Sequence, residues 1–297
     1  MTERTNFAHV WLLAARPRTL PAAVSPVLLG MALAWGDGVF YFPAGGIALA
    51  AAVFIQIAAN YANDYYDYIK GADADGRLGP VRATQAGLVT PAQMRSAVVI
   101  TLAFASVTGL YLVYRGGWPI LLIGLLSMLF AILYTGGPLP LGYIGVADLF
   151  VLVFFGPVAV SGTYYVQALQ MPGIPILIGF APGLLSVAIL TVNNLRDVDQ
   201  DRRAGKKTLA VRFGVAYARG QYLVCLFLAL VLIPVAVVLY TGRPLLCLTL
   251  FAVIPAAGCV KTVFTQRAGD VLNMCLANTG KVLLLFSVLF SLGWVLS

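Results

Sequence analysis

The sequence predicts an all-α membrane protein in which nine helices cross the bilayer. Of its 297 residues, 61% are hydrophobic and only 10% are charged, whereas soluble domains carry about 25% charged residues. The mean hydropathy is +0.92. The apolar residues also form long stretches, and a bilayer-spanning helix needs roughly 20 consecutive, mostly apolar residues. A soluble core does not absorb that much apolar surface, so the chain is predicted to be a polytopic membrane protein.

The predicted spans follow one another along nearly the whole chain. They cover residues 11–35, 39–62, 91–114, 118–134, 143–168, 174–195, 217–240, 244–264 and 276–296. The first apolar run continues past Ala34 and lacks a polar cleavage region, so we expect it to remain as a span and not to be removed as a signal peptide. Most connections are short. Residues 1–297 are therefore predicted to form one transmembrane domain.

The basic residues predict the orientation of this bundle, whose nine spans place the two termini on opposite sides. Apart from Arg115 and Arg243, every lysine and arginine lies on the N-terminal side. The positive-inside rule therefore places the N-terminus in the cytoplasm of a multi-pass protein of the cell (inner) membrane. The net charge of +8 is explained by this orientation and by attraction to membrane lipids or diphosphates, so we expect no nucleic-acid partner.

Thiol and imidazole chemistry is not indicated. Cys225, Cys247, Cys259 and Cys275 lie in or beside apolar spans, with no CxxC pair and no nearby histidine, so we expect them to pack in the bundle. The single histidine, His9, precedes the first span and is predicted to be an interfacial residue. Both observations argue against histidine-dependent catalysis.

Two longer connections, 63–90 and 196–216, contain seven of the 11 acidic residues. These are Asp64, Asp67, Asp73, Asp75, Asp197, Asp199 and Asp201. Each region has the pattern Asn-x3-Asp at the end of an apolar helix, followed by glycine and lysine. Residues three or four apart share one helix face. The pattern therefore predicts two polar stripes at the cytoplasmic ends of spans two and six, formed by Asn60, Asn63, Asp64 and Asp67 and by Asn193, Asp197 and Asp201.

These carboxylates predict a bound cation. Clustered carboxylates repel one another and are costly at a membrane boundary unless a cation or a water-filled cavity compensates them. With oxygen ligands only, the candidate ions are Mg²⁺, Mn²⁺ and Ca²⁺. Mg²⁺ commonly bridges carboxylates to substrate phosphates, and basic residues that could neutralise a diphosphate lie nearby: Lys70, Arg77, Arg82, Arg196, Arg202, Lys206 and Lys207. The sequence thus predicts metal-dependent chemistry on a diphosphate.

Two metal sites facing each other would allow pyrophosphate to leave from an allylic carbon, which generates a carbocation at the membrane surface. Aromatic faces stabilise such a cation without reacting with it. The candidates are Tyr61, Tyr65, Tyr66, Tyr68 and Tyr134. For each of these tyrosines the alternative is a place in the interfacial aromatic belt.

The two acidic motifs, Asn63-Asp64-x2-Asp67 and Asp197-x3-Asp201, resemble those of the UbiA superfamily of intramembrane aromatic prenyltransferases. The resemblance begins at Arg16-Pro17-x-Thr19-Leu20 and extends beyond Asn278. Within the superfamily the chain is most similar to the 1,4-dihydroxy-2-naphthoate polyprenyltransferases of menaquinone synthesis, as judged from the phrases NDYYDYIKGAD, YTGGPLPLGY and NNLRDVDQDRRAGKKTLAVRFG.

The resemblance implies nine helices around a central cavity with a cytoplasmic cap. It also implies roles for residues of this chain. The implied metal or diphosphate ligands are Asn63, Asp67, Asp197 and Asp201, supported by Asp64 and Asp73, with Asn193 and Arg196 orienting the second motif. Diphosphate contacts are expected from Lys70, Arg77, Arg196, Arg202, Lys206 and Thr208. Arg16, Tyr134 and Thr135 match positions near the reacting groups, and Asn60 is expected to support them.

The implied reaction is the Mg²⁺-dependent transfer of a polyprenyl group from its diphosphate to 1,4-dihydroxy-2-naphthoate, with loss of CO₂ and a proton. Mn²⁺ is an alternative metal. Two positions depart from the wider pattern: residues 139–142 lack the lysine that some members place after the tyrosine motif, and Gly71 replaces a fourth acidic residue. The second departure weakens 4-hydroxybenzoate as the acceptor, although it and homogentisate stay open.

Other readings of the acidic residues are weaker. The segment Asp197-x-Asp199-x-Asp201 continues with Arg202 instead of glycine, which disfavours a Ca²⁺ loop. A cation-coupled secondary transporter would hold its acidic residues near the bilayer midplane, whereas these lie at the cytoplasmic edge. A phosphatidyl-group transferase would have contiguous aspartate motifs. A solvated acidic face explains one such motif but not two at matching helix ends.

Two single residues stay open at this point. Asp148 near the start of span five is interpreted as a structural residue of the bundle end. Lys281 opens span nine, where it either extends to the lipid headgroups or contacts the acceptor carboxylate.

Overall fold

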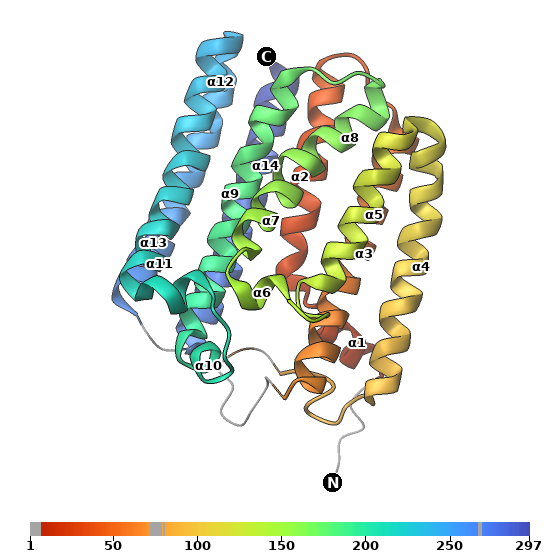
Figure 1. Ribbon diagram of the computed structural model, residues 1–297. Coiled ribbons are helices and arrows are strands. Elements are labelled where there is room, and N and C mark those ends of the chain that lie inside the picture. Colours follow the sequence, from red (N-terminus) through yellow and green to blue (C-terminus); the bar gives the residue numbers. More distant parts are fainter. Residues whose placement is uncertain (1–6, 72–78, 80, 267–268) are drawn as a thin grey trace.

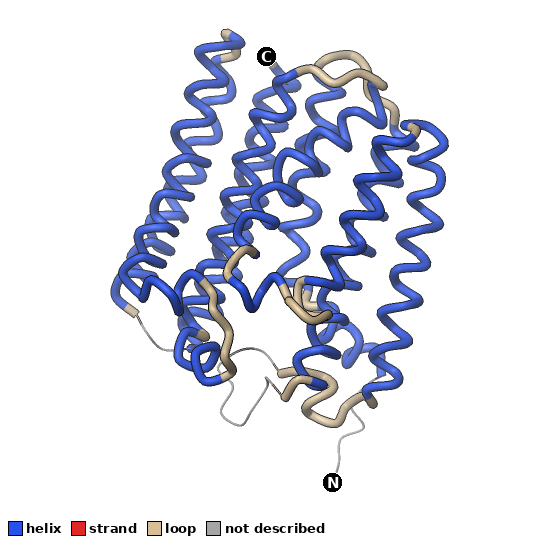
Figure 2. Tube along the Cα trace, in the orientation of Figure 1, coloured by secondary structure: helices blue, strands red, loops and turns tan. Residues whose placement is uncertain are grey.

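The computed structural model describes residues 7–71, 79, 81–266 and 269–297. All regular secondary structure in these ranges is helical, as Figure 2 shows. The long helices lie side by side in one bundle, with α1 at one end and the C-terminus at the other (Figure 1). The expected all-α class is therefore confirmed.

The first half of the bundle contains the helices before and after the long connection between Ile69 and Pro91. They are α1 (Phe7–Ala15), the 3-10 turn η1 (Pro17–Thr19), α2 (Leu20–Gly36), α3 (Phe42–Ile69), α4 (Pro91–Gly116) and α5 (Trp118–Leu133). A capping box between Thr90 and Gln93 begins α4 by supplying partners for helix-terminal amides, and Pro91 in the first turn has no amide that needs one. Gly117, with φ 71°, lets the chain reverse between α4 and α5.

The second half contains shorter helical pieces that combine into further spans. They are α6 (Leu141–Ile144), α7 (Ala147–Val153), the π-helical turn η2 (Phe154–Val158), α8 (Ala159–Ala168), α9 (Gly173–Arg196), α10 (Val198–Arg203), α11 (Leu209–Phe227), the π-helical turn η3 (Leu228–Leu232), α12 (Ile233–Thr241), the 3-10 segment η4 (Pro244–Ala252), α13 (Val253–Thr265) and α14 (Gly269–Leu296).

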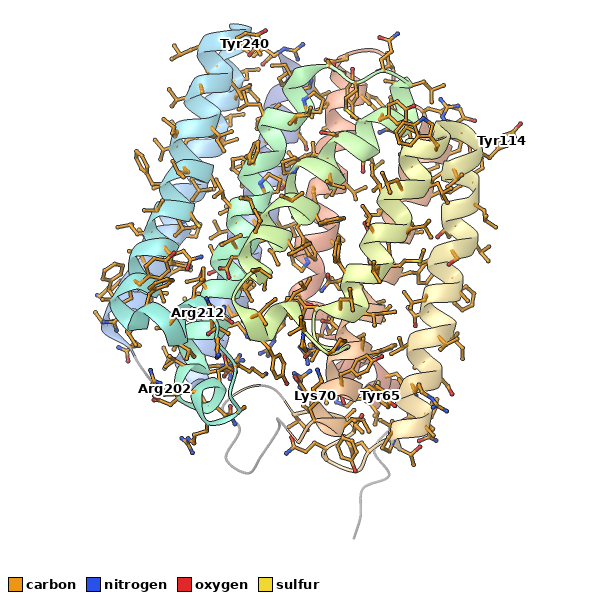
Figure 3. The ribbon with its side chains drawn as sticks, viewed as in Figure 1. Tyr65, Lys70, Tyr114, Arg202, Arg212 and Tyr240 are labelled. Atoms are coloured by element: carbon orange, nitrogen blue, oxygen red, sulfur yellow. The ribbon has the colours of Figure 1, made fainter. Side chains whose placement is uncertain are left out.

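Eight helical segments of the described chain are long and apolar enough to cross a membrane, and α5, with 16 residues, is a shorter ninth apolar helix. This agrees approximately with the nine predicted spans. Figure 3 places Tyr114 and Tyr240 at one end of the bundle and Lys70 and Arg202 at the other. The exposed Trp35 and Trp118 also belong to the first of these ends, which suits an interfacial aromatic belt.

Several boundaries differ from those that hydropathy predicts. The acidic segment after residue 62 is still helical, since α3 continues to Ile69. The span expected to begin at 217 is preceded by helix from Leu209, with a kink at Gly214, and α14 begins at Gly269. Polar residues at helix ends lower the hydropathy without ending the hydrogen-bonded helix, so apolarity alone underestimates helix length.

Close packing of backbones joins α9 to the broken helix α7–η2–α8. A Cβ atom on Gly179 would lie 2.5 Å from Pro157 Cα, and one on Gly183 would meet the carbonyl oxygen of Leu152. Gly179 and Gly183 form a small-x3-small stripe, which lets membrane helices approach closely. This contact fixes α9, and hence the second acidic motif at its end, relative to the rest of the bundle.

We expect Gly179→Ala to lower the stability of the purified protein by about 1–3 kcal/mol, because the added methyl group forces packed backbones apart. Thermal unfolding in detergent measures the effect. The control is Gly124→Ala in α5, where an added Cβ meets nothing within 4 Å. An equal loss of stability in both variants would contradict this account.

Candidate active site

The first acidic motif occupies the last turns of α3, where its side chains separate toward different partners. Asp64 and Asp67 are buried, each about 1% exposed, and Asn63 is half-buried. Asn63 Nδ2 donates to Thr135 Oγ1 at 2.7 Å. The predicted stripe is therefore present, but its members do not all face one point.

A break between α1 and α2 brings Arg16 to this motif. Arg16 has φ 50°, a left-handed conformation that is unusual for a residue other than glycine and costs roughly 1–2 kcal/mol. Its guanidinium donates to Asn63 Oδ1 at 2.9 Å. The amide of Asn60 holds the break, since it donates to the carbonyl of Ala15 at 2.8 Å and to Thr19 Oγ1 at 3.1 Å. Strained backbone of this kind concentrates at functional sites.

Asp64 is turned toward the backbone. Its two carboxylate oxygens accept from the amides of Ala83 and Thr84 at 3.0 and 3.1 Å. These bonds hold the segment that carries Arg82, which in turn donates to Asp67 Oδ2 at 2.8 Å. In this structure Asp64 therefore positions the loop that contacts the motif.

Asp67 and Asp201 come together at a single ammonium group. Lys206 Nζ lies 3.7 Å from Asp67 Oδ1 and 3.6 Å from Asp201 Oδ1. Asp67 belongs to α3 and Asp201 to α10, so Lys206 joins the two motifs. Tyr143 Oη also donates to Asp67 Oδ1 at 3.0 Å. The four groups form one compact polar centre.

The second motif is organised by Arg196 at the end of α9. Its guanidinium donates to both carboxylate oxygens of Asp197, to Asn193 Oδ1 at 2.8 Å and to Asn273 Oδ1 of α14 at 2.6 Å. A planar guanidinium with several donors fixes carboxylate and amide acceptors in one orientation. Arg196 thus determines the direction in which Asp197 presents its oxygens.

Burial and the neighbouring charges alter the pKa values of two groups at this centre. The pKa of Asp201 is raised to about 6, mainly by burial; Lys206 opposes this rise, and the neighbouring Asp197 and Asp67 add to it. Burial lowers the pKa of Lys70, partly offset by Asp67. A carboxyl that is hard to ionise beside other carboxylates is stabilised in its charged form by an additional cation.

Lys70 and Tyr143 connect the centre to the turn that follows α5. Lys70 Nζ donates to the carbonyl oxygens of Thr135 and Gly137 at 2.6 and 3.3 Å. The ammonium groups of Lys70 and Lys206 lie 4.9 and 4.8 Å from the centre of the Tyr143 ring, within cation–π distance. This ring therefore contacts two cations while its hydroxyl contacts Asp67.

Sequence reasoning missed Tyr143. The residue closes the phrase YTGGPLPLGY and lies in the short helix α6. A tyrosine in a Gly- and Pro-rich turn beside a predicted site was the available signal. Tyr134, at the start of the same phrase, is half-buried and lies close enough to Asp148, Asp201 and Asp67 for these carboxylates to raise its pKa, although burial is the main cause.

Several predicted site residues lie elsewhere or have other contacts. Arg202 pairs with Asp199 at 3.1 Å on the exposed side of α10, and it points away from the bundle in Figure 3. Thr208 caps α11 by accepting from the amide of Val211 at 3.3 Å. Asp148 accepts from Gln221 at 2.7 Å. Asp73, Asp75 and Arg77 lie outside the described residues.

The other tyrosines that the sequence suggests for stabilising a carbocation have contacts of different kinds. Tyr61 packs edge-on against Trp11, and Tyr65 packs edge-on against Tyr66. Tyr68 is exposed. These contacts suit interfacial packing more than a shared cation-binding face.

The donor set fits a metal ion that is shared with a substrate. Within the described ranges no three Asp, Glu, Cys or His side chains are grouped closely enough to form a complete metal site. Mg²⁺ is usually held by one or two carboxylates together with substrate phosphates, and Asp67 and Asp201 supply such a pair. The residues present therefore suit a metal–diphosphate unit better than an ion held by protein ligands alone.

Comparison with known proteins gives concordant matches. The model of the UbiA prenyltransferase family matches residues 23–272. The 1,4-dihydroxy-2-naphthoate octaprenyltransferase of Escherichia coli (strain K12) is 43% identical over 77% of this chain and 76% of its own length. The enzyme with the same name from Mycobacterium tuberculosis is 41% identical over 95% of both chains. These matches confirm the resemblance inferred from the two acidic motifs.

A similar fold occurs in a solved structure of a UbiA homolog from Archaeoglobus fulgidus bound to DMAPP and Mg²⁺. The TM-score is 0.68, with 17% sequence identity over 96% of this chain and 98% of the other. The bundle architecture is therefore that of the family.

We expect Asp64→Ala to reduce stability strongly, because it leaves the buried amides of Ala83 and Thr84 without their acceptor at about 1–3 kcal/mol for each unpaired donor. The measurement is thermal unfolding of the purified protein. Asp199→Ala is the matched control, since that aspartate is exposed and exposed ion pairs contribute little. If the two variants unfold at the same temperature, Asp64 does not hold the loop.

Proposed function

This chain belongs to the UbiA prenyltransferase family and is a multi-pass membrane prenyltransferase, and we propose that it transfers a polyprenyl group from polyprenyl diphosphate to 1,4-dihydroxy-2-naphthoate. The E. coli and M. tuberculosis relatives carry the name of that activity. We place the acidic end of the bundle and the N-terminus in the cytoplasm of the cell membrane, from the distribution of basic residues.

One geometric observation carries the proposal: the carboxylates of Asp67 and Asp201 both lie within 4 Å of Lys206 Nζ. Two motifs that are distant in sequence therefore bring negative and positive groups together. A diphosphate with its divalent metal needs such a mixture, since the metal takes carboxylate oxygens and the phosphates take ammonium and guanidinium donors.

We propose Asp67 and Asp201 as the principal metal ligands, with Asn63 and Asp197 beside them. When bound, Mg²⁺ would neutralise charge that develops on the leaving diphosphate; Mn²⁺ could replace it. Asn193 and Arg196 keep Asp197 in place. A metal ion that took the position of the Lys206 ammonium near Asp67 and Asp201 would leave Lys206 free to bind the diphosphate.

The remaining residues divide between the two substrates. Lys70, Lys206 and Arg82 are close enough to Asp67 to reach a diphosphate held there. Arg16 contacts Asn63, and Thr135 contacts the same side chain, so we assign both to the reacting end of the prenyl chain and the acceptor. The half-buried ring of Tyr134 is the candidate for stabilising an allylic cation.

The proposed reaction breaks the allylic C–O bond, and its electron pair leaves with the diphosphate. A C–C bond then forms between the allylic carbon and the electron-rich ring. The ring loses its carboxylate as CO₂, and the electron pair of that bond restores aromaticity. The charged end of the donor meets the polar centre, while its apolar chain stays among the lipid-facing helices, so each part lies in a medium that solvates it.

Replacing Asp67 or Asp201 by alanine should lower the transfer rate by at least about 100-fold, because preorganised electrostatic groups contribute this much in other enzymes. Product formation from geranylgeranyl diphosphate, Mg²⁺ and acceptor is followed by mass spectrometry. Asp199→Ala on the exposed face of α10 is the control and should keep near-normal activity. Full activity of both Asp67→Ala and Asp201→Ala would refute the assignment.

A panel of acceptors tests the substrate. We expect purified protein to prenylate 1,4-dihydroxy-2-naphthoate with loss of CO₂, to stop when EDTA removes the metal, and to resume when Mg²⁺ is added. If the protein instead prenylates 4-hydroxybenzoate or homogentisate, its acceptor is of another class. Ion-coupled uptake into liposomes without any prenylated product would favour a transporter.

A further inference from the structure

A groove between α13 and α14 lies outside the acidic centre. Its cavity volume is about 450 Å³, and its lining includes Pro255, Gly258 and Thr262 from α13 with Met274, Asn278 and Lys281 from α14. The helices touch at its base, where Cys275 Sγ lies 3.7 Å from the carbonyl oxygen of Cys259. A Cβ on Gly258 would meet no heavy atom within 4 Å, so this glycine leaves the groove open.

The groove carries polar groups that the rest of the protein does not use. Lys281 and Asn278 are both exposed, and neither side chain forms a hydrogen bond or ion pair within the described ranges. Asn273, by contrast, faces another direction on α14 and contacts Arg196 of the acidic centre. The groove therefore presents an ammonium and an amide to whatever lies beside the bundle.

The level of Lys281 in the membrane follows from its neighbours. Gly280 lies against the carbonyl of Arg18 in η1, just before α2, and Gly36 at the end of α2 lies against Trp294. Trp294 also accepts from Arg243 of the far connection, which marks the far boundary. Trp294 is thirteen positions after Lys281, which corresponds to about 20 Å at 1.5 Å per residue.

A hydrocarbon layer of roughly 30 Å leaves Lys281 about 10 Å inside the near boundary, which is the side of the acidic centre. Side chains on a helix tilt toward its N-terminus, and for α14 that end lies on the same side. The lysine stem therefore carries its ammonium toward the headgroup level. The groove continues from there toward Val271, and it crosses the boundary between acyl chains and headgroups.

We propose that this groove binds the phosphate headgroup of an anionic phospholipid from the leaflet next to the acidic centre. One ammonium matches the single negative charge of a phosphodiester, and the Asn278 amide supplies a second donor. Pro255, which lines the part of the groove nearer the middle of the bilayer, provides apolar surface for the beginning of the acyl chains. A polyprenyl diphosphate carries more negative charge, which the several cations and carboxylates around Asp67 match better.

Native mass spectrometry of the full-length protein, titrated with phosphatidylglycerol or phosphatidylcholine in neutral detergent, tests the proposal. We expect one tightly bound phosphatidylglycerol and weaker binding of phosphatidylcholine. Lys281→Met should raise the apparent Kd for phosphatidylglycerol roughly tenfold or more, the usual effect of losing a charge-assisted hydrogen bond. Lys281→Arg should restore binding, and Gly258→Leu, which fills the groove, should weaken it for both lipids.

The matched control is Lys261→Met. Lys261 is exposed on α13 beside Thr262 but does not line the groove, so this variant loses the same charge and should bind phosphatidylglycerol normally. Equal weakening by Lys261→Met and Lys281→Met would show unspecific attraction and overturn the proposal. Unchanged binding in Lys281→Met, displacement of the lipid by equimolar geranylgeranyl diphosphate, or a second copy of the chain in place of the lipid would each overturn it as well.

Discussion

The contact of Lys206 with Asp67 and Asp201 is the interaction on which the functional centre depends. A positive charge between two carboxylates from different helices offsets their repulsion, which grows as water is excluded. Lys206 supplies that charge, and the Tyr143 hydroxyl stabilises the Asp67 carboxylate by donating a hydrogen bond to it. The same balance makes the centre suitable for a metal–diphosphate unit, because both partners of such a unit find groups of opposite charge already in place.

The surrounding helices hold this balance through local devices at their ends. The left-handed Arg16 interrupts the first span and directs its guanidinium to Asn63, while Asp64 holds the Arg82 loop through two backbone amides. On the opposite side, Arg196 connects Asp197 to α14. Each device satisfies backbone or side-chain groups that would otherwise be buried without partners, which is costly away from water.

Polar chemistry and lipid contact are divided between faces of the same helices. On α14, Asn273 contacts the acidic centre, whereas Asn278 and Lys281 line a groove on the outside. A helix can serve both because side chains about 100° apart around its axis meet different surroundings. If a phospholipid occupies that groove, it contacts the helix that also supports Arg196.

The sequence by itself determined the membrane class, the approximate positions of the spans and the two acidic motifs, because apolar length and helical spacing are local properties of the chain. It also placed Asn63 and Asp67 on one stripe. Only the tertiary structure decided that Asp67 meets Asp201 through Lys206, that Asp64 binds backbone amides, that Arg202 faces outward and that Tyr143 belongs to the centre. These outcomes depend on how helices distant in sequence pack and turn, and spacing along one helix carries no information about the direction from which its partner arrives.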